Sequence, residues 1–108
     1  MAKARLDASE IVDWNSFHDV CARELGFPSF YGRNLDAWID CLSYLDEGDG
    51  MSRFTLAPGQ SLEIELIASD DLRRRVPNIL VAVVDCARFV NQRYVERGKD
   101  PLVRVILK

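Results

Sequence analysis

Asp36 and Asp40 are the residues whose type and spacing most clearly suggest chemistry. They lie four positions apart in the run FYGRNLDAWIDCL, which spans Phe30 to Leu42, so on a helix they share one face. Like charges at this spacing destabilise a helix by roughly 0.2–0.5 kcal/mol. The helix dipole favours a carboxylate in the first turn, at Asp36, but Asp40 has no basic residue three or four positions away. We therefore interpret both as candidate binding residues, the alternative being a solvated helix face.

The residues around this pair predict one turn followed by one helix, from Asn34 to Leu45. Gly32 suits a sharp chain reversal, because it can adopt positive φ. Asn34 fits the N-cap, where its side chain accepts from free backbone N–H groups. Ile39 and Ser43 lie beside the two aspartates. A separate apolar stripe recurs at helical spacing, at Leu35, Trp38, Leu42 and Leu45.

This run resembles the barstar family, small intracellular inhibitors of secreted bacterial ribonucleases. The family pattern has two aromatic residues and a glycine, then Asn-Leu-Asp-Ala, then Asp-Cys-Leu at the next turn. Here it stands as Phe30-Tyr31-Gly32, Asn34-Leu35-Asp36-Ala37 and Asp40-Cys41-Leu42. The match continues upstream without a gap through Trp14 to Leu25, including His18, and weakens downstream to an order of elements.

The resemblance implies a role for several of these positions. Asp40 would enter the phosphate-binding site of a ribonuclease, paired with its arginines and catalytic histidine, and Asp36 would meet a second basic residue at the cleft edge. Phe30 would be the main aromatic contact. The turn would bring backbone close to the partner. The complete predicted partner-binding set is Phe30, Tyr31, Gly32, Asn34, Asp36, Ile39, Asp40 and Ser43.

The chain also departs from the family pattern. Phe30 lacks the hydroxyl of the family's tyrosine, Ile39 stands where barstar has tryptophan, and Arg93 falls where barstar carries an acidic contact. The segment Asp46–Ser61 has no counterpart of equal length. These departures predict a different target, either another ribonuclease or another toxin with a basic cleft.

Hydrophobic periodicity and turn residues predict an α/β fold of order β-α-α-β-α-α-β in one domain, residues 1–108. Glu63 and Glu65 alternate with apolar residues and predict a strand with one wet face. A long loop, Asp46–Ser61, hints at a functional or mobile segment. Barstar-like folds have a three-stranded parallel sheet with helices packed on one face. The expected strands are 2–7, 62–68 and 102–107, and the expected helices are one capped by Asp13 or Asn15 and ended by Gly26, then 34–45, 70–76 and 77–97.

Composition describes an ordinary soluble globular domain, with 48% hydrophobic and 29% charged residues. No apolar run approaches the length of a membrane span, and the acidic start argues against a signal peptide. Cys21, Cys41 and Cys86 are widely spaced and odd in number. They indicate reduced thiols in a cytoplasmic protein.

Charge is distributed unevenly along the chain. Residues 1–72 carry five Lys or Arg against 14 Asp or Glu, whereas residues 73–108 carry nine against three. An acidic region favours cationic partners and speeds their capture, and it argues against nucleic acid as the ligand of that face. The alternative is that the acidic residues only keep the protein soluble.

Enzymatic chemistry has few candidate residues. His18 is the only histidine, and a structural role suits it better than catalysis. Cys41 flanks the apolar stripe and is interpreted as a core thiol. No cofactor-binding motif is present. Asp36 and Asp40 could together hold a metal ion in a small hydrolase, but no histidine or third carboxylate is placed to help.

We therefore predict a cytoplasmic, non-enzymatic immunity protein that blocks a cognate ribonuclease or nuclease toxin with the Asn34–Leu45 helix and the preceding turn. One alternative is an interaction module on the same fold with a partner that is not a nuclease. The other is the metal-dependent hydrolase that uses Asp36 and Asp40. No membrane and no direct nucleic-acid contact is expected.

Overall fold

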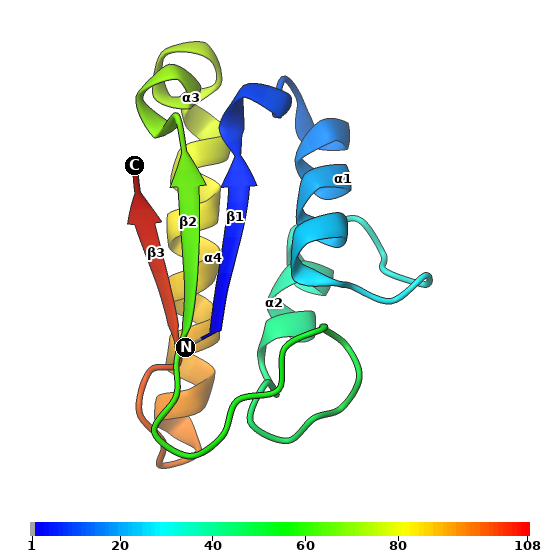
Figure 1. The fold of residues 1–108 in the computed structure, drawn as a ribbon, viewed down its shortest axis with the longest axis vertical. Helices are drawn as coiled ribbons and strands as arrows, with labels where there is room; N and C mark the ends of the chain where they lie inside the picture. Colours follow the sequence, from blue (N-terminus) through cyan, green and yellow to red (C-terminus); the bar gives the residue numbers. More distant parts are fainter. Residues whose placement is uncertain (1) are drawn as a thin grey trace.

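Three parallel strands form the sheet, with helices packed on one of its faces. The computed structural model describes residues 2–108. The strands β1 (Ala2–Asp7), β2 (Leu62–Ile67) and β3 (Val103–Leu107) lie in the order β1-β2-β3. Ala4 pairs with Ile64 and Ile64 with Val105. Figure 1 shows this sheet facing the viewer, with the longest helix behind it.

The connections between the strands are helical, as the sequence predicts. A short 3-10 helix, η1 (Ala8–Glu10), and the helices α1 (Trp14–Leu25) and α2 (Leu35–Leu42) separate β1 from β2. The helices α3 (Ser69–Arg75) and α4 (Pro77–Glu96) separate β2 from β3. The predicted order β-α-α-β-α-α-β and the three-stranded parallel sheet are therefore confirmed, and η1 is an addition that its three residues did not reveal.

The core lies between the sheet and the helices. Leu62, Ile64 and Leu66 of β2 are fully buried, because β2 is the central strand and its apolar side faces the helices. They meet Phe17 of α1 and Trp38 of α2 in one cluster of buried residues. Burying a side chain of this size contributes about 1.5–3 kcal/mol each, so the periodic apolar residues of the sequence account for the main packing.

The ends of α1 follow the capping signals of the sequence. Asp13 is the N-cap, and its carboxylate accepts from the backbone N–H of Ser16 at 2.8 Å. The Ser16 hydroxyl in turn bonds the backbone N–H of Asp13 at 3.0 Å, which completes a capping box. At the other end, Gly26 takes the left-handed conformation with φ 66°. Of the two predicted caps, Asp13 is right and Asn15 is wrong.

The open face of the sheet differs from the prediction of a wet strand face. Glu65 of β2 points away from the core, yet it is almost fully buried. Arg5 donates to its carboxylate at 3.0 Å, and Lys108 lies 2.9 Å from the other oxygen. Hydrogen bonds from Lys108 and Arg5 hold the pKa of Glu65 below its usual range. Cationic side chains of the outer strands thus cover the middle of this face.

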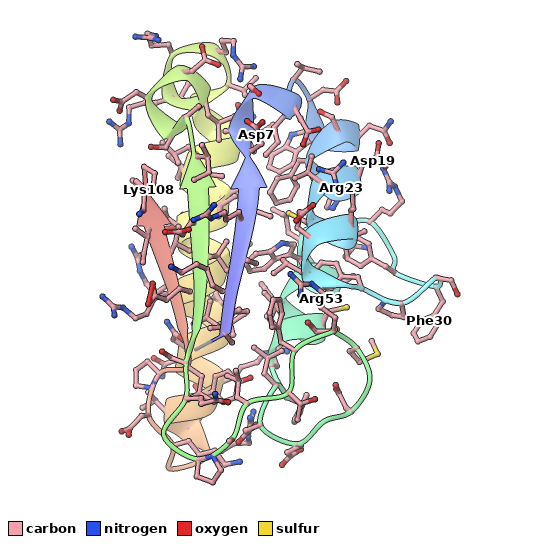
Figure 2. The ribbon with its side chains drawn as sticks, in the orientation of Figure 1. Asp7, Asp19, Arg23, Phe30, Arg53 and Lys108 are labelled. Atoms are coloured by element: carbon pink, nitrogen blue, oxygen red, sulfur yellow. The ribbon has the colours of Figure 1, made fainter. Side chains whose placement is uncertain are left out.

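The long loop that follows α2 is anchored to the rest of the molecule. The Ser52 hydroxyl and the Arg53 backbone N–H both donate to the Leu25 carbonyl, at 2.6 and 3.1 Å. The Arg53 guanidinium donates to the Glu24 carbonyl at 2.7 Å, and Figure 2 shows Arg53 beside the lower end of α1. Leu56 is buried in the core. The loop satisfies the free carbonyls at the end of α1, which gives its length a structural role.

Gly26 should be much less replaceable than Gly98, although both follow a helix with positive φ. A Cβ at Gly26 would lie 2.5 Å from Arg53 Cβ and 2.9 Å from the Arg53 backbone nitrogen, whereas a Cβ at Gly98 meets nothing within 4 Å. Gly98→Ala should lower the free energy of unfolding by about 1 kcal/mol, the cost of a left-handed residue. Gly26→Ala should cost about 3 kcal/mol, since overpacking adds to that strain. Urea denaturation of the two variants measures the difference, and equal losses would show that Arg53 does not press on Gly26.

Candidate functional site

The candidate site is the turn before α2 together with α2 itself. The Asn34 side chain caps the helix by accepting from the Ala37 backbone N–H at 2.8 Å, as predicted. The far end stops at Leu42, not at the predicted Leu45. The Tyr94 hydroxyl of α4 donates to the Leu42 carbonyl at 2.7 Å and accepts from the Leu45 N–H at 2.9 Å. These bonds replace the helical ones and fix α2 against α4.

Asp36 and Asp40 share one side of α2 and reach solvent, but their surroundings differ. Asp36 is exposed and forms no ion pair within residues 2–108. Asp40 has a side chain that is 61% exposed, and its Oδ1 lies 2.7 Å from Nη1 of Arg93 on α4. A tertiary ion pair therefore offsets the helix-level repulsion. The sequence singled out Arg93 as a departure from the family's acidic contact, but it did not reveal this ion pair with Asp40.

The chain reversal before α2 uses Arg33 where Gly32 was predicted. Arg33 has φ 54°, and Gly32 is not among the residues with positive φ. Arg33 is held in this conformation because its Nη2 donates to the Asn15 carbonyl and side-chain oxygens, at 2.9 and 2.6 Å, and its Nη1 pairs with Asp19 at 2.9 Å. A Cβ at Gly32 would lie 3.2 Å from the Asn34 side-chain nitrogen, so the glycine leaves room for the cap.

Phe30 is the most prominent apolar side chain of the turn. It is 73% exposed, and Figure 2 shows it at the tip of the turn, pointing away from the body of the molecule. Aromatic side chains are enriched among the residues that anchor protein interfaces. Its exposure leaves the Phe30 ring accessible to a partner, and its role as the main aromatic contact stays a prediction.

Tyr31 faces inward, unlike Phe30. Its ring packs on Phe27 with centroids 4.7 Å apart, and its hydroxyl lies 2.6 Å from Nδ1 of His18, with both residues buried. Burial, followed by the charge of Arg33, lowers the pKa of His18, which favours the neutral ring in this hydrogen bond to the Tyr31 hydroxyl. His18 thus has the structural role expected of it. Tyr31 supports the turn from its buried side, and its buried ring is not exposed to a partner.

Ser43 and Ile39, both predicted to contact the partner, differ in their exposure. Ser43 is fully buried; its hydroxyl donates to the Ile39 carbonyl at 2.6 Å and receives Nη1 of Arg93 at 3.1 Å. The Ser43 carbonyl accepts from Arg97 at 2.7 Å. Ile39 is half-buried and packs against the core while one side lines a surface hollow. Ser43 therefore positions Arg93, and Ile39 is the member of this pair that a partner can touch.

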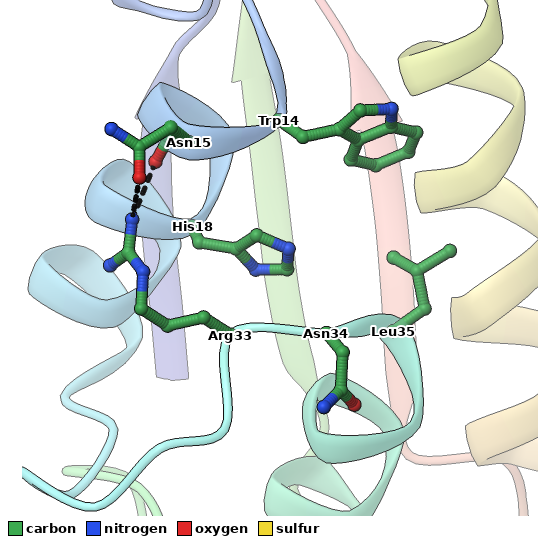
Figure 3. Close-up of a pocket in the computed structure, with 6 residues that line it drawn as sticks. All are labelled: Trp14, Asn15, His18, Arg33, Asn34 and Leu35. Atoms are coloured by element: carbon green, nitrogen blue, oxygen red, sulfur yellow. Dashed lines mark hydrogen bonds between the residues drawn. The ribbon is translucent and has the colours of Figure 1, made fainter.

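A shallow hollow lies on the α1 side of the turn. It is lined by Trp14, Asn15, His18, Arg33, Asn34 and Leu35. Figure 3 shows Trp14 above Leu35 on one side of the view and Arg33 bound to Asn15 on the other. Because Arg33 is already satisfied by Asn15 and Asp19, the hollow offers mainly apolar surface beside the turn.

The acidic and basic parts of the sequence are interleaved in space. Asp46 of the loop pairs with Lys99 and lies 4.0 Å from Arg97, Asp40 pairs with Arg93, and Glu65 pairs with Lys108. The basic C-terminal part thus neutralises much of the acidic N-terminal part. At the site, Asp40 is paired with Arg93, whereas Asp36 has no ion pair within residues 2–108.

Groups suited to catalysis are buried or scattered. Burial raises the pKa of Cys21 to about 12 and that of Cys41 to about 11, so both are protonated thiols at neutral pH, and Cys86 is likewise free and buried. Within residues 2–108, no three His, Cys, Asp or Glu side chains are grouped to hold a metal ion. Over the same residues, no helix combines the length and apolarity that a membrane crossing requires.

Residues on α4 complete this surface; the sequence analysis named only Arg93 among them, as a departure from the family's acidic contact, and missed the other three. Asp36 and Ile39 share a second hollow with Phe89, Gln92, Arg93 and Glu96. The spacing of these four α4 residues, at i, i+3, i+4 and i+7, already placed them on one helix face. That signal identified a common face but not its neighbour, since only the fold brings α4 against α2.

The fold and the site together define an α/β domain that presents a charged helix and an aromatic turn on its surface. The family described as "Barstar (barnase inhibitor)" matches residues 1–106, and the chain belongs to this family. A protein of Bacillus subtilis (strain 168), named "Putative ribonuclease inhibitor YrdF", is 42% identical over 43 residues. That match covers 40% of this chain and 47% of the relative, so it spans about half the length of that protein.

The buried pair of His18 and Tyr31 predicts a pH dependence of stability. The pKa of His18 in the folded chain lies below the ordinary value of 6.5, so the unfolded chain binds the proton more readily. The free energy of unfolding should therefore fall as the pH is lowered through 6.5. Urea denaturation at pH 7.5 and 5.5 should show a larger loss for wild type than for His18→Gln. Because His18 is the only histidine, an equal loss in both would contradict the assignment.

Proposed function

We propose that this chain inhibits a ribonuclease by placing α2 and the preceding turn over the enzyme's active site. The observation that carries the proposal is the exposed pair Asp36 and Asp40 on a capped and pinned helix, which follows a turn that exposes the ring of Phe30. The chain belongs to the family described as "Barstar (barnase inhibitor)", which supports the proposal. The name of the Bacillus relative supports it as well.

A ribonuclease suits these residues because its active site must bind phosphate. Cationic side chains in such a cleft lose their phosphate partner when an inhibitor covers it, and a carboxylate replaces it with charge-assisted hydrogen bonds. Asp40 is the proposed phosphate substitute, and Asp36 meets a second cation at the edge of the cleft. Phe30 packs on the rim, while Gly32 and Asn34 let the backbone approach.

Rigidity is the second requirement, and the anchoring of α2 supplies it. The cap at Asn34 holds one end of the helix and the Tyr94 hydroxyl holds the other. Arg33 and Tyr31 fix the turn from either side. A preordered surface loses little conformational entropy on binding, so the same contacts give higher affinity than a mobile acidic segment would.

The proposal extends to the setting and the extent of the protein. The described residues build one core cluster, and residues 1–108 are proposed as one domain with no enzymatic activity and no cofactor. Three free buried cysteines suit a reducing compartment, the cytoplasm of a bacterium. There the protein would act as an immunity protein against a secreted ribonuclease or a nuclease toxin with a basic cleft.

One observation favours an alternative partner on the same surface. Asp40 is already paired with Arg93, which lowers its net attraction for cations. The second candidate partner is therefore a protein that is not a nuclease, has no cationic cleft and binds the same α2 surface. Capture of the partner distinguishes the two, since a ribonuclease partner must lose activity on binding.

Asp40→Ala should abolish most of the inhibition. Removing one member of a charge pair that is buried across an interface costs about 2–5 kcal/mol, because the other member is left unpaired. Asp85→Ala is the matched control, since Asp85 lies on α4 and pairs with Arg88. The measurement is inhibition of a panel of small microbial ribonucleases by each variant. A loss below about 1 kcal/mol for Asp40→Ala, the range of an exposed pair, would remove the proposed mechanism.

Added salt should slow association more than it speeds dissociation. Exposed carboxylates steer a cationic cleft over long range, and a Debye length of about 8 Å at physiological ionic strength screens that attraction. Stopped-flow association at low and at physiological salt, with the same enzyme, measures the effect. Asp36→Asn should reduce the salt dependence of the association rate. A rate that does not change with salt contradicts electrostatic steering.

A further inference from the structure

The hollow between α2 and α4 extends the surface beyond the predicted residues. It measures about 350 Å³ and is lined by Asp36 and Ile39 from α2 and by Phe89, Gln92, Arg93 and Glu96 from α4. Phe89 is 62% exposed. Among its charged lining residues, Arg93 is the single cation beside two carboxylates. A partner that covers this hollow therefore meets one positive point within an acidic surface.

Arg93 uses only one side of its guanidinium within the molecule. Its Nη1 donates to Asp40 Oδ1 at 2.7 Å and to Ser43 Oγ at 3.1 Å. Within residues 2–108, Nε and Nη2 of Arg93 make no hydrogen bond, and the side chain is 43% exposed. An arginine has five N–H donors, and the free edge formed by Nε and Nη2 matches the two oxygens of a carboxylate.

Docking on a cationic cleft would change the ion pairing and the hydration of Arg93. Asp40 would be drawn toward the cations of the partner, and Arg93 would lose water beside charges of its own sign. The bond to the buried Ser43 hydroxyl holds the guanidinium in place, so withdrawal of the arginine would leave that hydroxyl without its donor. A carboxylate from the partner would instead balance the charge and satisfy the free N–H groups.

We infer that Arg93 selects ribonucleases that carry a carboxylate beside their cationic cleft. That carboxylate accepts from Nε and Nη2 of Arg93, while a cleft cation meets Asp40 through its Oδ2 atom. Phe89 and Ile39 then pack on apolar surface next to the carboxylate. The inference rests on the proposed function, and it makes α4 a determinant of partner choice in addition to α2.

The test uses the intact chain and an enzyme from the ribonuclease panel that wild type inhibits and Asp40→Ala does not. Arg93→Glu should raise the inhibition constant about 100-fold, as expected for a reversed charge in a buried pair. Arg88→Glu is the matched control: it makes the same charge change on α4, at a side chain that pairs with Asp85 and lies outside the hollow. It should change the constant about threefold or less, as for a peripheral surface pair. Thermal unfolding checks that both variants fold. If Arg93→Glu does not fold, Arg93→Gln replaces it, and the inhibition constant should then rise about tenfold.

Reversal of charge on the enzyme gives the decisive readout. Each Asp or Glu at the rim of the enzyme's cleft is replaced by Lys in turn. One of these enzyme variants should be inhibited poorly by the wild-type inhibitor, and Arg93→Glu should inhibit that variant about tenfold or more better than wild type does. The inference is overturned if Arg93→Glu behaves like Arg88→Glu or strengthens inhibition. It is also overturned if Arg93→Glu restores inhibition of none of the charge-reversed enzymes. Those results leave the role of Asp40 intact. If wild type inhibits no enzyme of the panel, the proposed function and this inference fail together.

Discussion

The hydroxyl of Tyr94 is the contact on which the position of the site depends. It is fully buried in α4, and it bonds both the last carbonyl of α2 and the N–H of Leu45. A buried carbonyl or N–H without a partner is costly, so this double contact strongly favours one position of α2 against α4. The alignment of Asp40 with Arg93 follows directly, since both side chains extend from helices that this hydroxyl joins.

The one-sided sheet explains why charge is distributed as it is. Parallel sheets are usually covered on both faces, but here helices cover only one. Glu65, on the central strand, is shielded by Arg5 of β1 and by Lys108, which directly follows β3. The basic residues near the C-terminus serve this face and the loop around Asp46. Part of the charge asymmetry of the sequence is thus used within the fold, on the open face and around the loop.

Local signals predicted the elements well because the forces that fix them are local. The cap at Asn34, the stop at Gly26 and the alternation of Leu62, Ile64 and Leu66 each depend on neighbours in the chain. The end of α2 depends on Tyr94, and the direction of Tyr31 depends on His18. These contacts join distant segments, so no pattern within α2 or its turn could reveal them. The positive φ of Arg33 has the same origin, since Asn15 and Asp19 of α1 hold it.

The same distinction separates what the family shares from what makes this chain particular. The motif of the turn and α2 is contiguous, so resemblance identifies it, and its carboxylates suit any cationic cleft. Arg93 lies 53 positions beyond Asp40, and its effect on the motif exists only in the folded molecule. An exposed pair of this kind contributes about 0.2–1 kcal/mol to stability, too little to explain its place by folding alone. Its free N–H edge points the explanation toward a partner, where desolvation makes the same guanidinium far more selective.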